Sequence, residues 1–409
     1  MIHSKIPLVL SILLAPAFLH GQTSPLLLRG ARVFTGEGPF REGLSILVDG
    51  GKIRAVGKDL PAPKGARILD LEGTWITPGL IDGNTSLGLP SPHENEESSE
   101  VTPQIKVSEG LDLGSADFRF ALHGGVTTAC VSPGGKNVFG GLDVLVKTAG
   151  GPEGARIFKD AVGLRITLGT MPGMGNLAFR GGRSDSMYFR RPTTRMGTIW
   201  EIRRAFYEAQ KNRESFTGKE PDRATRVLLA ALDHKIMVRM TARSDADLRT
   251  ALRLAREFKL RLVLDEAVDA YYLCDVLAAA GFPVIAAPPS VPQAGDQATP
   301  HLDTIALLAK AGVKVALQTG QGLGAQALIR EAAFAVRGGL PRTKALEAVT
   351  SVAAEVLGVE DRVGRLAKGL DADIVVWSAP PLRLGSRPLR IYIEGNLVHS
   401  EASGGGSGR

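Results

Sequence analysis

Hydrophobic positions in the middle of the chain follow two different periods. Short apolar runs typical of buried strands are separated by longer segments in which apolar residues recur every three or four positions. In residues 245–258, for example, the apolar positions share one helical face and arginines lie opposite. The predicted strands are residues 76–81, 126–131, 144–146, 162–168, 236–242, 261–264, 283–286 and 313–317. Eight strand–helix units predict an α/β fold of the (β/α)₈ TIM-barrel type.

Both ends of the chain have another pattern, in which short strands alternate with glycine turns. Predicted strands occur at residues 26–34, 44–48, 52–56 and 66–71, and again at 373–377 and 390–398. We expect the two ends to form one small β-sandwich domain from residues 24–79 and 369–401, with the barrel in residues 80–368.

The first residues have the pattern of a targeting segment. Lys5 precedes an apolar run at residues 6–19 that is too short and too interrupted by proline to span a membrane. This predicts a secretory signal peptide over residues 1–22 and export, to the periplasm of a Gram-negative bacterium. No second apolar run is long enough to cross a membrane, so no membrane span is expected.

Composition narrows the function classes. The hydrophobic fraction of 44% and charged fraction of 22% are those of a soluble globular protein. The net charge of +7 is spread along the chain without a basic run, which argues against nucleic-acid binding. The two cysteines, Cys130 and Cys274, lie among apolar neighbours, and we expect two unpaired thiols.

Four phrases carry a family resemblance. They are Ile-Thr-Pro-Gly-Leu-Ile-Asp-Gly at residues 76–83, His-Gly-Gly-Val-Thr-Thr at 123–128, Thr-Arg-Met-Gly at 194–197, and the segment 361–377. Together they resemble the amidohydrolase superfamily, in particular its imidazolonepropionase-like and exported branches. The resemblance implies a barrel whose mouth holds one or two metals. In that family the metals are bound by a His-x-His pair, a carboxylated lysine, two further histidines and an aspartate.

At each of those positions this chain has a residue that does not suit the metal. The positions are Asn84 and Ser86 after strand 1, Arg165 on strand 4, Thr241 or else Arg243 on strand 5, Glu266 on strand 6 and Gly320 after strand 8. Amide and hydroxyl oxygens are poor ligands for a catalytic transition metal, and a guanidinium cannot form a carbamate. Of the seven histidines, only His93 and His301 follow strands at the mouth.

Two functions follow from this pattern. The first is a non-catalytic protein that has lost its metal and cofactor chemistry and binds a small ligand or serves as a partner subunit, in a homo-oligomer or with an active relative. Arginines in the mouth could then bind a carboxylate or phosphate, and Glu266 could pair with Arg165, Arg239 or Arg243. The alternative is an active hydrolase of C–N bonds in non-peptide amides, cyclic amides or dipeptide-like substrates. It would use Glu266, His93 and a single divalent metal such as zinc.

Overall fold

The computed structural model describes residues 24–89, 94–96, 98–174, 191–215, 220–290, 296, 301–320 and 328–401. The predicted signal peptide and His93 lie outside these residues. Within them, no helix combines the length and the apolar character needed to cross a membrane.

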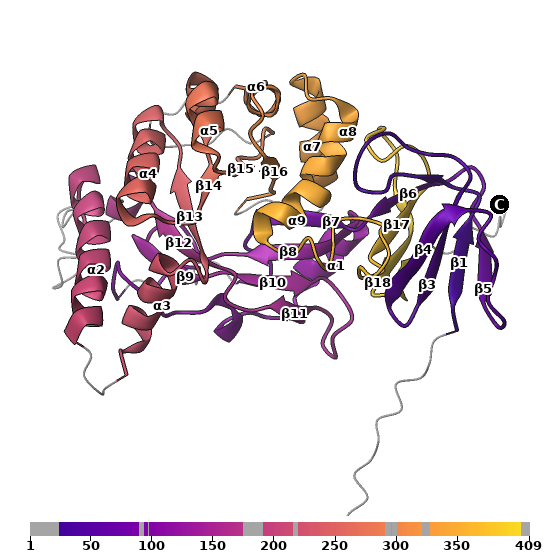
Figure 1. Cartoon of the computed structure of the whole chain (residues 1–409), viewed down its shortest axis with the longest axis horizontal. Coiled ribbons are helices and arrows are strands. Elements are labelled where there is room, and N and C mark those ends of the chain that lie inside the picture. The colour runs from indigo at the N-terminus through magenta and orange to yellow at the C-terminus, as the bar shows by residue number, and fades with distance from the viewer. Residues whose placement is uncertain are drawn as a thin grey trace, which may run out of the picture.

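The larger part of the molecule is a ring of strands surrounded by helices (Figure 1). Its strands are β7 (Leu80–Thr85), β8 (Val126–Val131), β9 (Phe139–Leu142) with β10 (Val144–Lys147), β12 (Gly163–Thr167), β13 (Met237–Ala242), β14 (Leu262–Glu266), β15 (Val284–Ala286) and β16 (Val315–Leu317). They form two sheets, ordered β16-β15-β14-β13-β12-β9 and β11-β10-β8-β7, where β11 is Arg156–Lys159. Only Asp143 separates β9 from β10, and a bridge between Thr85 and Gly320 joins the other edges, so the ring closes.

The third strand of the ring runs opposite to its neighbours, which corrects the expectation of eight strand–helix units. Val144 lies opposite Val131 in an antiparallel pair with β8, and Leu142 lies opposite Leu164 in an antiparallel pair with β12. Antiparallel neighbours can be joined by a short loop, whereas parallel neighbours need a long crossover. The chain therefore passes from β8 to β9 through residues 132–138 with no helix between them.

The first predicted barrel strand, residues 76–81, is divided between two domains. β6 (Trp75–Pro78) pairs with the C-terminal strand β17 (Ile374–Trp377), and β7 begins at Leu80. Gly79 stands at the crossing. A Cβ atom there would lie 2.0 Å from Oγ1 of Thr127, so the close approach of the two segments requires glycine.

Nine helices are found among the described residues, and most of them cover the outside of the ring (Figure 1). They are α1 (Ala116–His123), α2 (Arg195–Ser215), α3 (Arg223–Leu232), α4 (Asp245–Phe258), α5 (Cys274–Ala280), α6 (Thr304–Lys310), α7 (Leu328–Arg337), α8 (Arg342–Ala348) and α9 (Ser351–Leu357). The bounds of α4 agree with the predicted amphipathic helix. Ser244 caps it by accepting a hydrogen bond from the backbone N–H of Asp247 (3.3 Å).

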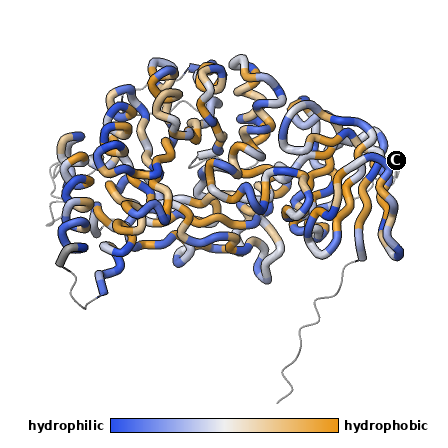
Figure 2. Tube along the Cα trace, viewed as in Figure 1, coloured by the Kyte–Doolittle hydropathy of each residue, from blue (hydrophilic) through white to orange (hydrophobic). Residues whose placement is uncertain are grey.

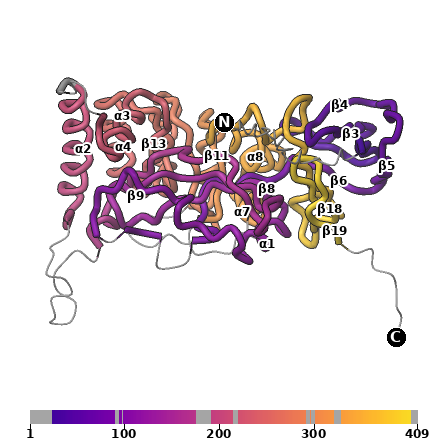
Figure 3. Tube along the Cα trace, turned by 90° about the horizontal axis from the view of Figure 1, so that it is seen from below, coloured from indigo at the N-terminus to yellow at the C-terminus, as the bar shows by residue number. Residues whose placement is uncertain are grey.

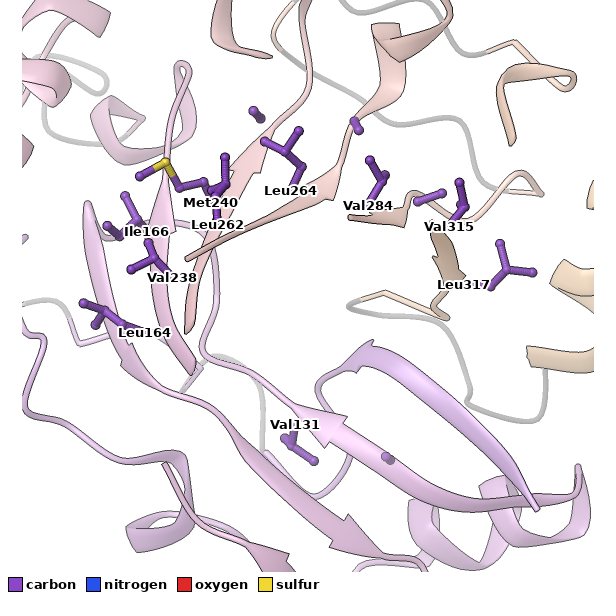
Figure 4. Close-up of a cluster of buried hydrophobic side chains, with 14 of the residues drawn as sticks. Val131, Leu164, Ile166, Val238, Met240, Leu262, Leu264, Val284, Val315 and Leu317 are labelled. Atoms are coloured by element: carbon purple, nitrogen blue, oxygen red, sulfur yellow. The ribbon is translucent and has the colours of Figure 1, made fainter. Parts of the chain in front are cut away.

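Alternate residues on the barrel strands pack against the helices and form the main hydrophobic core. Figure 4 shows this cluster around the ring, with contributions from β8 and β12 to β16. The strand segments are accordingly among the most hydrophobic parts of the chain (Figure 2). On β13 and β14 the residues of this core include Val238, Met240, Leu262 and Leu264. The residues between them must therefore point into the ring.

The smaller part contains two sheets. They are built from the N-terminal and C-terminal segments of the chain, and these segments lie side by side in Figures 1 and 3. One sheet has the order β4-β3-β1-β5, from Lys52–Lys58, Leu44–Asp49, Leu26–Arg29 and Arg67–Asp70. The other has the order β19-β18-β17-β6-β2, in which β19 is Asn396–Ser400, β18 is Pro388–Ile393 and β2 is Arg32–Val33. Residues of both sheets share one hydrophobic cluster, which includes Leu28, Ile46, Ile76, Ile374 and Val376. We call this part the two-sheet domain.

A buried ion pair connects the barrel to the two-sheet domain. Nζ of Lys147, on β10, lies 2.5 Å from a carboxylate oxygen of Asp373 and 3.9 Å from one of Asp371. The ammonium also lies 4.3 Å from the ring centre of Phe158. Both Lys147 and Asp373 are buried. A charge in such a place is tolerated only with its partner.

Lys147→Met should therefore destabilise the protein by about 3–5 kcal/mol, because the substitution keeps most of the side-chain volume but leaves the Asp373 carboxylate without its cation. Chemical denaturation followed by circular dichroism measures this loss. The matched control is Lys147→Met with Asp373→Asn, which removes both charges and should recover most of the stability. Equal destabilisation of the single and double variants would show that the ion pair does not matter.

Candidate functional site

The inside of the ring has an apolar layer below a polar layer. On β14, Val263 and Asp265 both point inward, and Asp265 lies nearer to the C-terminal end of the strand, which faces the barrel mouth. Apolar residues from the other strands belong to the same buried cluster as Val263, namely Ile81, Cys130, Leu145, Met237, Ile285 and Ala316. The polar layer occupies the level at which barrel enzymes place catalytic residues.

Asp265 is the centre of the polar layer. One carboxylate oxygen accepts a hydrogen bond from Nη1 of Arg165 on β12 (2.5 Å), and the other accepts one from Nη2 of Arg239 on β13 (2.9 Å). Arg239 also contacts Asp143 through Nη1 (3.0 Å). These four side chains are at most 2% exposed. Two guanidinium groups thus face two carboxylates away from solvent.

Amides extend the polar layer across the ring to β16. Nη1 of Arg165 lies 3.4 Å from Oδ1 of Asn84, whose Nδ2 donates to Oε1 of Gln318 (2.6 Å). Gln318 in turn donates to the backbone oxygen of Ile285 (3.2 Å). We call Asp143, Arg239, Asp265, Arg165, Asn84 and Gln318 the interior network.

Arg239 is held by further contacts that fix its place in the barrel. Its guanidinium donates to the backbone oxygen of Gly83 (3.1 Å), to Oγ of Ser132 (3.0 Å) and to Sγ of Cys130 (2.9 Å). Burial alone would lower the pKa of Arg239, but the charges of Asp265 and Asp143 raise it well above its usual range. Arg239 is therefore a permanent cation in the barrel interior. Burial raises the pKa of the Cys130 thiol to about 12, which keeps it protonated.

A second group of charges lies at the rim of the mouth. Arg243 forms an ion pair with Glu266, with a further contact of 3.2 Å between Nη2 and Oε1. Asp296 accepts hydrogen bonds from the backbone N–H (2.6 Å) and hydroxyl (2.5 Å) of Thr170, and it lies 3.2 Å from Nη2 of Arg195. These contacts link segments that follow β12, β13, β14 and β15.

The structure separates the residues singled out in the sequence into two sets. Asn84 and Arg165 belong to the interior network, and Thr241 points inward beside Asp265, its register partner on β14. Oγ1 of Thr241 is buried and has no hydrogen-bond partner among the described residues. The other set lies further out: Arg243 and Glu266 pair with each other, and Ser86 is half-buried after β7.

Gly320 has a structural role at its position after β16. Its backbone N–H donates to the backbone oxygen of Asn84 (3.0 Å), which helps to close the ring, and its φ of 73° favours glycine. His301 follows β15, and its ring stacks on Tyr271 with 4.0 Å between the ring centres.

Glu266 pairs with Arg243, one of the three arginines that the sequence offered as its partner, and a carboxylate that the sequence did not single out enters the barrel. Asp265, and not Glu266, points into the barrel, because Glu266 ends β14 with a left-handed φ of 70° and turns toward Arg243. Asp143 and Gln318 were not singled out either. Strict alternation from Val263 would have identified Asp265 as inward-facing. The partners of the other side chains could not be found in this way, because Asp143 and Arg239 are 96 residues apart in the sequence and Asn84 and Gln318 are 234 apart.

The interior network does not suit a catalytic metal. Imidazole, thiolate and free carboxylate are the usual ligands, whereas the polar layer offers amide oxygens and two carboxylates already bonded to arginines. Nearby guanidinium groups would also repel a divalent cation. Among the described residues, no group of three or more His, Cys, Asp and Glu is arranged to hold a metal.

Comparison with known proteins identifies the family. The model of the amidohydrolase family matches residues 75–398. The chain belongs to this family. The crystal structure of an amidohydrolase from Thermotoga maritima has a TM-score of 0.83 and 31% sequence identity, and the match covers 92% of this chain and 100% of that one. The predicted superfamily is therefore confirmed, and with it a TIM barrel of mixed α/β content.

Relatives with assigned names point to the same family. An imidazolonepropionase from Cupriavidus pinatubonensis is 25% identical over 394 residues, which is 88% of this chain and 90% of that protein. The amidohydrolase tasK from Hapsidospora irregularis is 28% identical over 92% of this chain. This chain spans only 43% of the length of tasK.

The interior network yields a stability prediction. Asp265→Asn should cost about 3–5 kcal/mol, because it leaves Arg165 and Arg239 buried with one negative charge fewer between them. Glu266→Gln, at the partly solvated rim, is the matched control and should cost roughly 1 kcal/mol. Urea denaturation of both variants measures the difference. A loss for Asp265→Asn no larger than that for Glu266→Gln would mean that Asp265 does not hold the network together.

Asp82 is a second buried carboxylate, next to the interior network. It accepts hydrogen bonds from the backbone N–H (3.0 Å) and hydroxyl (2.5 Å) of Thr319, and so ties β7 to the end of β16. Burial raises the pKa of Asp82 to about 7, despite the hydrogen bonds from Thr319, which lower it. The folded protein therefore holds this carboxyl protonated at mildly acidic pH.

The raised pKa of Asp82 predicts a loss of stability as the pH rises. Between its unfolded pKa near 3.8 and its folded pKa of about 7, only the folded state binds the proton, so stability falls by up to about 1.4 kcal/mol per pH unit. Asp82→Asn cannot ionise and should lessen the fall between pH 5 and pH 8, as measured by urea denaturation at both values. An unchanged slope in the variant would show that Asp82 does not titrate in this range.

Proposed function

We propose that this chain is a non-catalytic member of the amidohydrolase family that acts as a partner subunit. The observation that carries the proposal is the shared Asp265 carboxylate, which binds Arg165 and Arg239 at the level where the family's metal ligands would lie. Lewis-acid activation of water contributes several kcal/mol to hydrolysis, and a polar network does not replace it. No metal or other cofactor is proposed for the barrel.

The same contacts weaken the idea of an anion-binding arginine pocket. A guanidinium recognises a carboxylate or phosphate by donating two parallel hydrogen bonds. Arg165 and Arg239 already donate to Asp265, and Arg243 donates to Glu266. A ligand at the donors in these bonds would have to displace a carboxylate, although Nε of Arg165 and Nε of Arg239 have no hydrogen-bond partner among the described residues. A role in assembly, with the active relative or a second copy as partner, therefore fits better than binding of a small anion.

The alternative of an active C–N hydrolase is supported by the relatives, which are named as hydrolytic enzymes of this family. It would need Glu266 to bind a metal or serve as a base together with His93. Glu266 is already engaged by Arg243 at the rim. Activity would therefore require this ion pair to break.

Export to the periplasm belongs to the same proposal and is supported by the sequence. Lys5 and the apolar run at residues 6–19 have the pattern of a cleavable secretory signal. A partner subunit of this kind would meet its partner outside the cytoplasm.

Metal content is the test of the proposal. Protein purified without chelator should contain far less than one zinc, iron or manganese ion per chain, as measured by inductively coupled plasma mass spectrometry. The matched control is Glu266→Gln, which removes the strongest remaining ligand candidate and should leave the reading unchanged. Stoichiometric metal in the natural protein that disappears in Glu266→Gln would overturn the proposal and favour the hydrolase.

A further inference from the structure

Three stacked aromatic rings lie where the segments after β14 and β15 meet. Tyr271 belongs to a short 3₁₀ segment, Val268–Leu273, and stacks with Tyr272 at 4.1 Å and with His301 at 4.0 Å between ring centres. Tyr272 leaves 67% of its surface exposed. We call Tyr271, Tyr272 and His301 the aromatic platform. Segments that follow parallel strands lie at the mouth of the barrel, so the platform stands on that rim.

Acidic side chains surround the aromatic platform. Asp303 lies 3.9 Å from His301, and Asp275 is exposed one turn beyond Tyr272. Burial, the neighbouring Tyr272 hydroxyl, and the negative charges of Asp269 and Asp303 together raise the pKa of Tyr271 to about 12. The platform thus sits in a field of negative charge, although the chain as a whole carries a net charge of +7.

Exposed apolar side chains lie on or beside the helices that pack against the platform's 3₁₀ segment. Val276 on α5 is 39% exposed, and Leu302 and Leu307, beside and within α6, are each 37% exposed. The two helices pack against each other and against the platform's 3₁₀ segment, and they lie next to each other in Figure 1. A single small cation would cover only part of such a surface. An extended ligand with both basic and apolar side chains would cover all of it.

We infer that the aromatic platform is the docking site for a basic segment of a protein partner, with an arginine or lysine stacked on Tyr272 and paired with Asp303 or Asp275. Aromatic faces attract cations within about 6 Å of the ring centre, and carboxylates beside them add to the attraction. The charge complementarity selects a cationic partner. This inference rests on the proposed role as a partner subunit and names the surface that role would use.

Peptide binding tests the inference directly. The full chain is titrated by isothermal calorimetry at low salt with a peptide of alternating arginine and leucine, and with a matched peptide of alternating glutamate and leucine. We expect only the arginine peptide to bind. Tyr272→Ala and Asp303→Asn should each weaken that binding at least five-fold. Trp200→Ala removes an aromatic side chain that is 61% exposed on α2, far along the chain from the platform, and should leave the binding unchanged.

The outcomes separate this inference from the others. Unchanged binding in Tyr272→Ala and Asp303→Asn, with unchanged melting temperatures, would overturn the docking site. If arginine methyl ester binds as tightly as the peptide, the site takes a free organic cation and the assignment to a protein segment is wrong. Metal content does not depend on the platform. The peptide experiment can therefore contradict the docking site while the non-catalytic assignment stands, and the metal measurement can contradict that assignment while the docking site stands.

Discussion

The barrel interior depends on one carboxylate, that of Asp265, shared by two arginines. A buried guanidinium without a partner carries a desolvation cost of several kcal/mol, and two of them on adjacent strands would also repel each other. Asp265 lies on the strand next to Arg239 and offers one oxygen to each arginine. Asp143 supplies the second negative charge from the opposite side of Arg239. The charges balance only when all four side chains are in place.

The direction of the third strand is part of this arrangement. Asp143 is the single residue between β9 and β10, where the chain leaves its pairing with β12 and begins its pairing with β8. From this junction its side chain reaches Arg239 on β13. The antiparallel strand thus brings the Asp143 carboxylate into the ring. A barrel of eight regular strand–helix units, as predicted from the sequence, has no such junction between two strand segments. The direction of this strand therefore determines where one of the two interior carboxylates lies.

Periodicity predicted the strands and helices well but not how they are joined. The apolar pattern fixed α4 residue by residue because its buried face repeats over fourteen positions. A short apolar run such as residues 144–146 gives no information about direction, because a buried strand looks the same in either orientation. Residues 76–81 looked like one strand because Pro78 and Gly79 interrupt the backbone and not the hydrophobic pattern. Asn84 and Arg165 were found through the family resemblance, but their partners lie far away in the sequence, and only the folded chain brings them together.

A guanidinium and a metal ion can both neutralise carboxylates in a barrel, but they differ in the coordination positions that they leave free. Both bring positive charge to carboxylates at the mouth of a barrel. A metal keeps open positions for water or substrate, whereas Arg165 and Arg239 both donate to Asp265, and Arg239 also donates to Asp143 and to the backbone oxygen of Gly83. These contacts hold the strands β12, β13 and β14 in a fixed arrangement. On the rim, by contrast, Tyr272 is exposed near the carboxylates beside Tyr271. Recognition at the rim would need no reactive centre below it, which is consistent with the role that we propose for this chain as a partner subunit.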